Sequence, residues 1–294
     1  MIKYIKNKNE EIYMKTGIIF EGGASRTAYS CGVMDCLLDN EIYIDYVLGV
    51  SAGIAYGVSY SSRQKGRNYA IFEKFVEDPR YMGIKHFLGK KRSYYNLDFI
   101  YGEMPDKYLP FDWDAYMKYG MTSYAVITNI NTGLPKYYRI DEVDKNWKIL
   151  RATSSLPILF QSVEINGNLY IDGGISDSIP FEYALNNGCD KVIVVLTRER
   201  DFVKKKESII PLIKIAYKKY PKLIEAMENR HIMYNNELEK LRKLEKEGKA
   251  LVIAPADTHN IGRTERKSSI LLPYFKEGYD FTSTIINEIK SFIE

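Results

Sequence analysis

The first part of the chain alternates short apolar runs with segments of helical periodicity. Residues 16–21 form an apolar run that ends in two glycines, and residues 25–40 place apolar side chains at three- and four-residue spacing. A second apolar run over 44–50 is cut off by Ser51-Ala52-Gly53 and is followed by a small-residue helical segment. This β-α-β-α order predicts parallel strands joined by crossover helices.

The same alternation continues to the end of the chain, except over residues 66–120. In that stretch, helical patterns at 68–76 and 113–118 alternate with loops that carry tyrosine and glycine, and no firm assignment follows. Beyond it, strands are expected at 121–130, 135–140, 169–171, 192–196 and 251–254, and helices at 145–151, 180–187, 208–247 (two or three helices) and 271–293.

These elements predict one α/β domain. Residues 1–15 are expected to be a loose lead-in, and residues 16–294 a single domain with no internal repeat or linker. Within it, residues 16–200 carry the motifs described below, and residues 201–294 form a mainly helical part.

Composition and charge exclude several function classes. Hydrophobic residues make up 45% and charged residues 27% of the chain, which is ordinary for a folded protein. A net charge of +4 and the absence of a nucleic-acid motif argue against a nucleic-acid partner, despite 25 tyrosines. No apolar run reaches the roughly 18 residues of a membrane span.

The cysteines and histidines favour neither disulfides nor a metal site. Cys31, Cys36 and Cys189 form no paired framework, and the N-terminal residues lack the apolar core of a signal peptide. A reducing, cytoplasmic location is therefore expected. The three histidines lack partners at metal-ligand spacing, so no metal or other cofactor is expected.

The pentapeptide from Gly49 to Gly53 places Ser51 between an expected strand and an expected helix. A sharp turn there strains the serine backbone, and the two flanking glycines let neighbouring chain pass close. The hydroxyl then stands at a helix N-terminus, where the dipole favours a developing negative charge. A glycine-flanked turn with an N-capping serine gives the same letters, but the strand–helix context favours a nucleophile.

A glycine-rich loop follows the first expected strand and opens the first helix. Gly22 and Gly23 leave backbone N–H groups unobstructed, and such a nest can hold a phosphate or a tetrahedral oxyanion. A dinucleotide site requires glycines where Ala24 and Thr27 stand. By itself, the glycine pair fits an oxyanion loop and a tight turn equally.

A serine nucleophile needs a proton acceptor at neutral pH. Asp172 ends an apolar strand and precedes Gly173 and Gly174, which open the backbone around its carboxylate. An isolated Asp-Gly-Gly is more often a plain turn, so its interpretation as a base depends on the other two motifs.

Together and in this order, the three motifs resemble those of the bacterial patatin-like phospholipases. That family carries G-G-G-x-R-G, then G-x-S-x-G, then D-G-[GA] far downstream, and this chain reads GGASRT from Gly22, GVSAG from Gly49 and DGG from Asp172. The resemblance covers about residues 16–200, including a small-residue segment over 152–157 that leads to a proline.

The resemblance implies a three-layer α/β/α sandwich with a mostly parallel central sheet. It also implies a serine acyl-ester hydrolase, a phospholipase or other lipid acyl hydrolase, that uses a Ser51–Asp172 dyad without a catalytic histidine. The N–H groups around Gly22, Gly23 and Ala24 would hold the oxyanion. Arg26 matches the arginine of the family motif and would brace that loop.

Two departures from the family pattern leave alternatives open. Ala24 keeps a backbone donor if its φ and ψ suit an L-residue, and Thr27 adds a β-branched side chain where close packing is usual. The first alternative is a catalytically weak lipid-binding or regulatory protein of the same fold. The second is an ordinary α/β-hydrolase with Ser51, Asp172 and His259 in that chain order, although its nucleophile usually follows more than two strands.

Lysines gather in the segment from Lys204 to Lys222, which contains seven of them and one acid, Glu207. A basic amphipathic helix can lie peripherally on an anionic membrane. A solvated helix that packs its apolar side on the core gives the same pattern, so both interpretations stay open. The sequence specifies no oligomeric state.

Overall fold

The computed structural model describes the chain except residues 1–13, 88–92, 120–121, 142–143 and 145. The expected lead-in over residues 1–15 therefore lies almost entirely outside the described residues. The strands are β1 Thr16–Phe20, β2 Tyr46–Val50, β3 Thr122–Asn129, β4 Pro135–Ile140, β5 Val163–Ile165, β6 Asn168–Asp172, β7 Lys191–Val195 and β8 Ala250–Ile253.

The eight strands form one sheet, in the order β5-β6-β3-β2-β1-β7-β8, with β4 also paired to β3. Neighbours among β3, β2, β1, β7 and β8 run parallel. β4 and β6 run antiparallel to β3, and β5 runs antiparallel to β6. The parallel strands β1, β2 and β7 are buried almost throughout because helices cover both of their faces.

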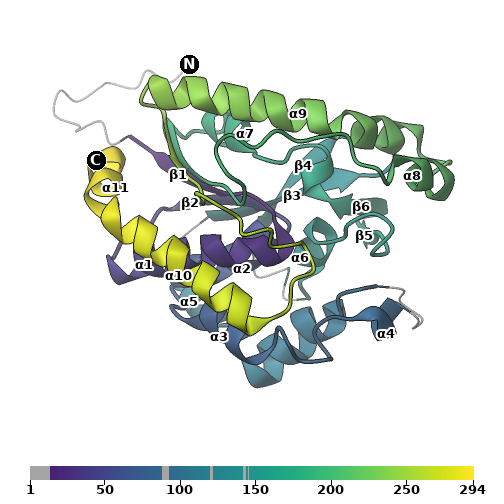
Figure 1. The fold of residues 1–294 in the computed structure, drawn as a ribbon, viewed down its shortest axis with the longest axis horizontal. Coiled ribbons are helices and arrows are strands. Elements are labelled where there is room, and N and C mark those ends of the chain that lie inside the picture. The colour runs from purple at the N-terminus through teal and green to yellow at the C-terminus, as the bar shows by residue number, and fades with distance from the viewer. Residues whose placement is uncertain (1–13, 88–92, 120–121, 142–143, 145) are drawn as a thin grey trace, which may run out of the picture.

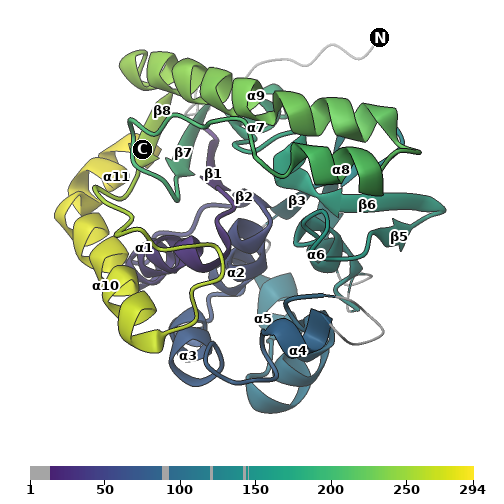
Figure 2. The same cartoon turned by 45° about the vertical axis from the view of Figure 1, so that its right-hand side comes forward.

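Helices form the two outer layers. The α-helices are α1 Ala28–Asp39, α2 Ala52–Ser61, α3 Arg67–Lys74, α4 Ile84–Phe87, α5 Trp113–Lys118, α6 Lys148–Thr153, α7 Phe181–Asn186, α8 Ile210–Ala216, α9 Pro221–Lys246, α10 Ser268–Thr284 and α11 Ile286–Ile293. The structure also contains the 3-10 helices η1 Ala24–Thr27 and η4 Gly173–Ile175 and the π-helix η2 Phe99–Tyr108. In Figures 1 and 2, α7 and α9 lie on one side of the sheet and α1, α2 and α10 on the other.

Alternate residues of β1 feed the two resulting cores. Ile18 and Phe20 pack with apolar residues of α1 and α2, whereas Ile19 packs with apolar residues of α7 and α9. This period of two is what a strand between two helix layers requires. The predicted three-layer α/β/α sandwich with a mostly parallel sheet is confirmed.

Several expected elements differ in their bounds, and two of these differences have a local cause. The helix expected from residue 145 begins at Lys148, because Trp147 adopts a left-handed backbone with φ of 57°. The strand expected at 169–171 is one arm of a hairpin with β5, which the sequence interpretation missed. Asn166 and Gly167 make its two-residue turn, both at positive φ.

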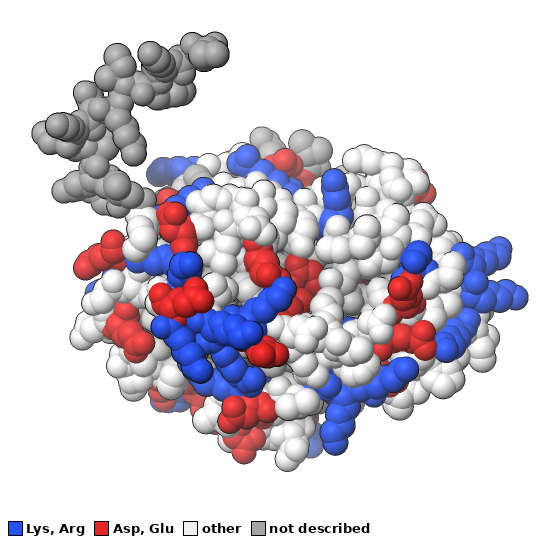
Figure 3. Space-filling view, turned by 90° about the horizontal axis from the view of Figure 1, so that it is seen from above, with Lys and Arg blue, Asp and Glu red and all other residues white. Residues whose placement is uncertain are grey.

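The lysine-rich segment 204–222 is not one helix. It forms a loop, then α8, then the start of α9. Ile213 of α8 is fully buried, whereas Leu212 and Ile215 are 48% and 73% exposed. Figure 3 views the molecule from the α9 side and shows basic side chains projecting at the end where α8 lies, with acidic side chains beside them.

The three cysteines are buried free thiols. None of the helices in the described part of the chain combines the length and apolar character that crossing a bilayer requires.

Candidate active site

Ser51 occupies the predicted sharp turn between β2 and α2. Its backbone has φ of 52° and ψ of −131°, a region that residues with a Cβ rarely adopt. Thr153, at the end of α6, holds this turn through two hydrogen bonds. The Thr153 hydroxyl accepts the N–H of Ser51 at 2.8 Å and donates to the carbonyl of Val126 in β3 at 2.6 Å.

The glycines around Ser51 allow two segments to pass close together. A Cβ at Gly53 would lie 2.4 Å from the carbonyl oxygen of Phe20, so any side chain there would displace β1. Gly49 packs against the backbone of Ile54 in the same way. The supporting role that the sequence assigns to both glycines therefore has a steric basis.

The strand register brings Asp172 to the end of β2. Val50 pairs with Val126, and Asp172 pairs with the next residue of β3, Ile127. Because β4 occupies the other edge of β3 at these positions, β2 and β6 share one edge and meet end to end. Successive residues of a strand lie about 3.3 Å apart. Ser51, which follows β2, and Asp172, which ends β6, therefore lie next to each other at the point where the two strands end.

The carboxylate of Asp172 is buried and incompletely bonded. Its Oδ1 accepts the N–H of Gly174 at 2.9 Å, whereas Oδ2 has no hydrogen bond of good geometry within the described residues. Burial raises the pKa of Asp172 above its ordinary value, and the nearby Ser51 hydroxyl, Arg230 and the Gly174 N–H partly oppose this. Gly173 and Gly174 begin the turn η4, and a Cβ at Gly173 would meet the Val126 carbonyl.

The glycine-rich loop lies directly against Ser51. A Cβ at Gly22 would lie 2.9 Å from the Cβ of Ser51. Within the described part of the chain, the N–H groups of Gly22, Gly23 and Ala24 donate to no protein acceptor. Free N–H groups beside a nucleophile are what an oxyanion requires.

Ala24 adopts φ of 50°, in the left-handed region. The sequence interpretation accepted alanine here on the condition that its φ and ψ suit an L-residue, and this condition is not met. The loop therefore holds its donors at the cost of backbone strain.

The side chain of Arg26 does not brace the loop by hydrogen bonds, although its backbone N–H donates to the Gly23 carbonyl at 3.2 Å. It is 6% exposed, and its guanidinium forms no hydrogen bond or ion pair with the residues that the structure describes. The loop is held by its neighbours instead. The Glu21 carboxylate accepts the Thr197 N–H at 2.6 Å and the Tyr234 hydroxyl at 2.9 Å, and the Ser25 hydroxyl donates to the carbonyl of Arg263 at 3.0 Å.

Two cavities of opposite character meet at Ser51, Ala24 and Leu156. One is apolar, has a volume of about 100 Å³ and extends between α2, α3 and η2. Its walls include Tyr56, Ile71, Phe72, Met82, Met104 and Phe160. The other is polar, has a volume of about 320 Å³, and contains Asp172 and several arginine and lysine side chains.

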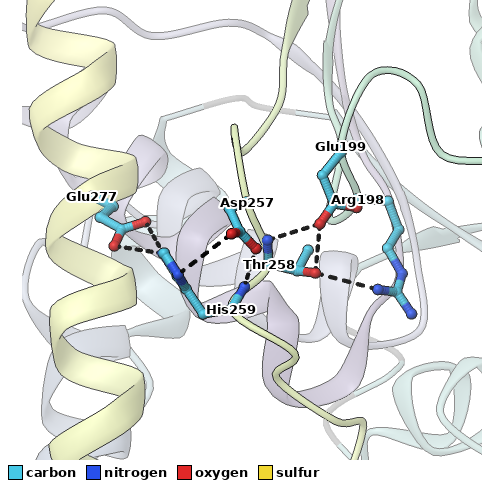
Figure 4. Close-up of polar contacts among 6 residues, drawn as sticks. All are labelled: Arg198, Glu199, Asp257, Thr258, His259 and Glu277. Atoms are coloured by element: carbon cyan, nitrogen blue, oxygen red, sulfur yellow. Dashed lines mark hydrogen bonds and ion pairs between the residues drawn. The ribbon is translucent and has the colours of Figure 1, made fainter.

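His259, the third member of the alternative triad, lies apart from Asp172. Figure 4 shows its ring directed toward Glu277 of α10, and Nε2 lies 2.9 and 3.0 Å from the two carboxylate oxygens of Glu277. Its Nδ1 is 4.0 Å from Asp257. The imidazole thus pairs with two other carboxylates, and it lines neither cavity at Ser51.

Some residues of the site were not identified from the sequence. Thr153 and Ser155, whose carbonyl accepts the Asp172 N–H at 2.9 Å, lie in the segment noted only for its resemblance to the family. Lys204, Arg230 and Arg263 come from distant loops and helices, and no local pattern distinguishes them from surface charges.

Comparison with known proteins gives two family matches. A model described as "Patatin-like phospholipase" matches residues 18–185, and one described as "Domain of unknown function (DUF6363)" matches residues 220–294. The first match contains Ser51, Asp172 and the glycine-rich loop.

Two curated proteins illustrate the similarity. The chain is 25% identical over 189 residues to "Uncharacterized protein YjjU" of Escherichia coli (strain K12), and the match covers 62% of this chain and 52% of that protein. It is 24% identical over 196 residues to "Lysophospholipase NTE1" of Saccharomyces cerevisiae, covering 61% of this chain and 10% of that protein. The match thus spans about half of one relative and a tenth of the other.

A solved structure, that of VipD from Legionella pneumophila, aligns with 94% of this chain and 67% of its own at a TM-score of 0.44 and 12% identity.

Proposed function

The chain belongs to the patatin-like phospholipase family, and on this premise we propose that it is a serine acyl-ester hydrolase acting on lipids, a phospholipase or related lipid acyl hydrolase. One observation carries the proposal. Ser51, a buried carboxylate oxygen of Asp172 and the N–H groups of the glycine-rich loop lie together where an apolar cavity meets a polar one, and among the described residues neither the oxygen nor these N–H groups have a hydrogen-bond partner.

The reaction follows from these positions. Asp172 Oδ2 accepts the proton of the Ser51 hydroxyl as Oγ attacks the ester carbonyl. The N–H groups of Gly22, Gly23 and Ala24 stabilise the resulting oxyanion. The tetrahedral intermediate collapses to an acyl-serine, and the leaving alcohol takes the proton from Asp172. Water then attacks the acyl-serine, giving its proton to Asp172, and the proton returns to Ser51 as the fatty acid leaves.

The environment of Asp172 suits this role. Burial makes its carboxylate more basic than that of an exposed aspartate. Gly174 fixes Oδ1, which leaves Oδ2 as the oxygen able to receive a proton. The missing hydrogen bond to Ser51 is no objection, because catalytic hydrogen bonds often tighten only when substrate binds.

The two cavities hold different parts of a lipid substrate. The acyl chain occupies the apolar cavity, whose aromatic and aliphatic walls begin at the nucleophile. The alcohol part of the ester then lies on the polar side.

The test uses a fluorophosphonate probe and a panel of phospholipid, lysophospholipid and p-nitrophenyl esters. We expect wild type to be labelled and active, and Ser51→Ala to be unlabelled with turnover lower by about a millionfold. Folded wild type that is neither labelled nor active would instead support the lipid-binding alternative. Comparable turnover by Ser51→Ala would refute the proposal.

Two further variants separate the dyad from the triad. Asp172→Asn should lose activity by about four orders of magnitude or more, whereas His259→Ala should keep most of it because its ring pairs with Glu277. A folded but inactive His259→Ala would favour the α/β-hydrolase mechanism.

We also propose that the α8 end contacts an anionic membrane as a peripheral protein. Leu212 and Ile215 project outward from α8, and lysines surround them in the segment 204–222. Lys205 of the same segment also lines the polar cavity, so a membrane held here would deliver lipid to its rim. The free thiols support a reducing compartment, with the protein on the cytoplasmic side.

Liposome sedimentation tests this contact. Ile215→Ser should weaken binding to anionic vesicles, and rising salt should weaken wild-type binding because surface attraction is screened over about 8–10 Å at physiological strength. Ile232→Ser is the control, since Ile232 lies on α9 and is also exposed, at 50%. Equal binding to neutral and anionic vesicles at every salt concentration would contradict the idea.

A further inference from the structure

The polar cavity beside Ser51 has an excess of cationic side chains. Its lining includes six of them, Arg26, Arg198, Lys204, Lys205, Arg230 and Arg263, against three acids. They come from η1, from the loop after β7, from α9 and from the loop after β8. Four separate parts of the chain thus direct positive charge into one space.

The acids neutralise this charge only in part, because three carboxylates face six cations. Asp172 is the candidate base, and Glu21 is occupied by the Thr197 N–H and the Tyr234 hydroxyl. Glu207 is the one acid of the cavity that pairs with its cations. It lies 2.6 Å from Arg230 and 3.4 Å from Arg263, so it positions two arginines and balances one charge.

Arg26 provides an independent observation about the charge of this cavity. It is more than nine-tenths buried, and its Nε has no hydrogen-bond partner. Burial, together with repulsion from Arg198 and Arg263, lowers the pKa of Arg26 to about 10. The Glu21 carboxylate opposes this lowering only in part. A buried cation whose charge is incompletely balanced is unfavourable, so this arrangement suits a cavity that takes up an anion.

Lys204 of the same cavity extends the pattern. Its backbone is fixed to α9 by Asn235, and its ammonium lies 4.8 Å from the centre of the Tyr234 ring. No carboxylate of the described residues forms an ion pair with it. Burial and the neighbouring Arg230 and Arg263 lower the pKa of Lys204 to about 7.

We infer that this cavity is a phosphate-binding subsite, in which Lys204, Arg263 and Arg26 receive the phosphate of a phospholipid head group whose acyl carbonyl lies at Ser51. Several cations converging from different directions suit a tetrahedral anion that carries more than one acceptor oxygen, and arginine can bind two such oxygens at once. The head-group assignment rests on the proposed hydrolase function. The phosphate chemistry does not.

The first arm of the test measures anion binding without catalysis. Titration calorimetry with inorganic phosphate is carried out on wild type and on Ser51→Ala, which keeps the cavity. Lys204→Gln and Arg263→Gln should each weaken phosphate binding by about tenfold or more, the loss expected for one charged hydrogen bond. Arg266→Gln is the matched control, with the same charge change in the same loop on an exposed residue. Unfolding curves check that all variants fold.

The second arm identifies the source of the phosphate. Hydrolysis of an anionic phospholipid is compared with that of an uncharged p-nitrophenyl ester. If the head group binds here, the ratio of the two kcat/KM values falls about tenfold in Lys204→Gln and Arg263→Gln and stays constant in Arg266→Gln. If phosphate binding weakens but the ratio is constant, the subsite takes free phosphate and the head-group assignment is wrong.

Failure of this inference is distinguishable from failure of the proposed function. Phosphate binding that all five proteins share equally, or that is absent from wild type, overturns the subsite even if the esters are hydrolysed. Selective loss of phosphate binding in a protein that hydrolyses no ester keeps the subsite and refutes the hydrolase.

Discussion

The strained backbone of Ser51 leads to a prediction that separates the effect of backbone conformation on stability from the effect of the hydroxyl on activity. Both Ser51→Ala and Ser51→Gly remove the hydroxyl of the proposed nucleophile, so both should be inactive. They differ in the backbone, because alanine keeps the Cβ that is strained at φ of 52° and ψ of −131° and glycine does not. Ser51→Gly should therefore be the more stable of two inactive proteins.

The size of the difference follows from two opposing terms. Holding a residue with a Cβ in a sparsely populated region costs about 1–3 kcal/mol. Glycine loses more freedom on folding, which offsets about 0.4–1 kcal/mol. The net gain over alanine is about 0.5–2 kcal/mol, because the lost hydroxyl cancels in the comparison. In a chain of this size, 1 kcal/mol changes Tm by roughly 2–4 °C.

Equilibrium denaturation in urea, with thermal melting alongside, measures the difference. Ser30 provides the matched control, because it lies in α1 with an unpartnered hydroxyl. There the order should reverse, with glycine about 1 kcal/mol less stable than alanine. A Ser51→Gly protein that is no more stable than Ser51→Ala would refute the idea that this turn is strained.

Three further predictions concern titration. Because burial raises the pKa of Asp172 and the base must be ionised, activity should fall with decreasing pH at a pKa above the ordinary aspartate value, as kcat/KM profiles will show. The same burial penalises the charged form in the folded state above that pKa, so Asp172→Asn should melt at a higher temperature than wild type at neutral pH while being inactive. Sulfate keeps a constant charge in this pH range, so it reports on the protein alone. The affinity of the polar cavity for sulfate should decrease as pH rises through about 7, because Lys204, which lies among Arg230, Arg263, Glu207 and Glu21, loses its proton there. Lys204→Gln should abolish this pH dependence.

The part of the site that could be predicted is encoded in short segments. The sharp turn at Ser51 requires only a strand, the serine and two glycines, and each of these can be recognised in a few consecutive residues of the sequence. The hairpin of β5 and β6 had an equally local signal in Asn166–Gly167, the dipeptide best suited to a two-residue turn, and it was overlooked.

The remaining features depend on packing between distant segments. The π-helix η2 contains Pro105 and is stabilised by burying Phe99, Tyr101 and Met104 in the core. The periodicity of an α-helix therefore does not predict it. The polar cavity joins Arg26 with Arg263, which are distant in sequence. Each arginine resembles an ordinary surface charge until the fold brings them together.

The C-terminal part contributes to the same site, which supports the proposal that residues 16–294 are one unit. β8 extends the sheet beside β7, and α10 crosses α1 so closely that a Cβ at Gly32 would lie 1.9 Å from the carbonyl oxygen of Phe275. Arg230 of α9 donates to the carbonyl of Gly174 beside the candidate base, and the Arg263 carbonyl accepts the Ser25 hydroxyl of the glycine-rich loop. The segment that matches the family of unknown function therefore contacts both halves of the candidate site, while the patatin-like segment contains the proposed reacting groups. Substrate selection by Lys204 and Arg263 would thus lie outside the part of the chain that identifies the family.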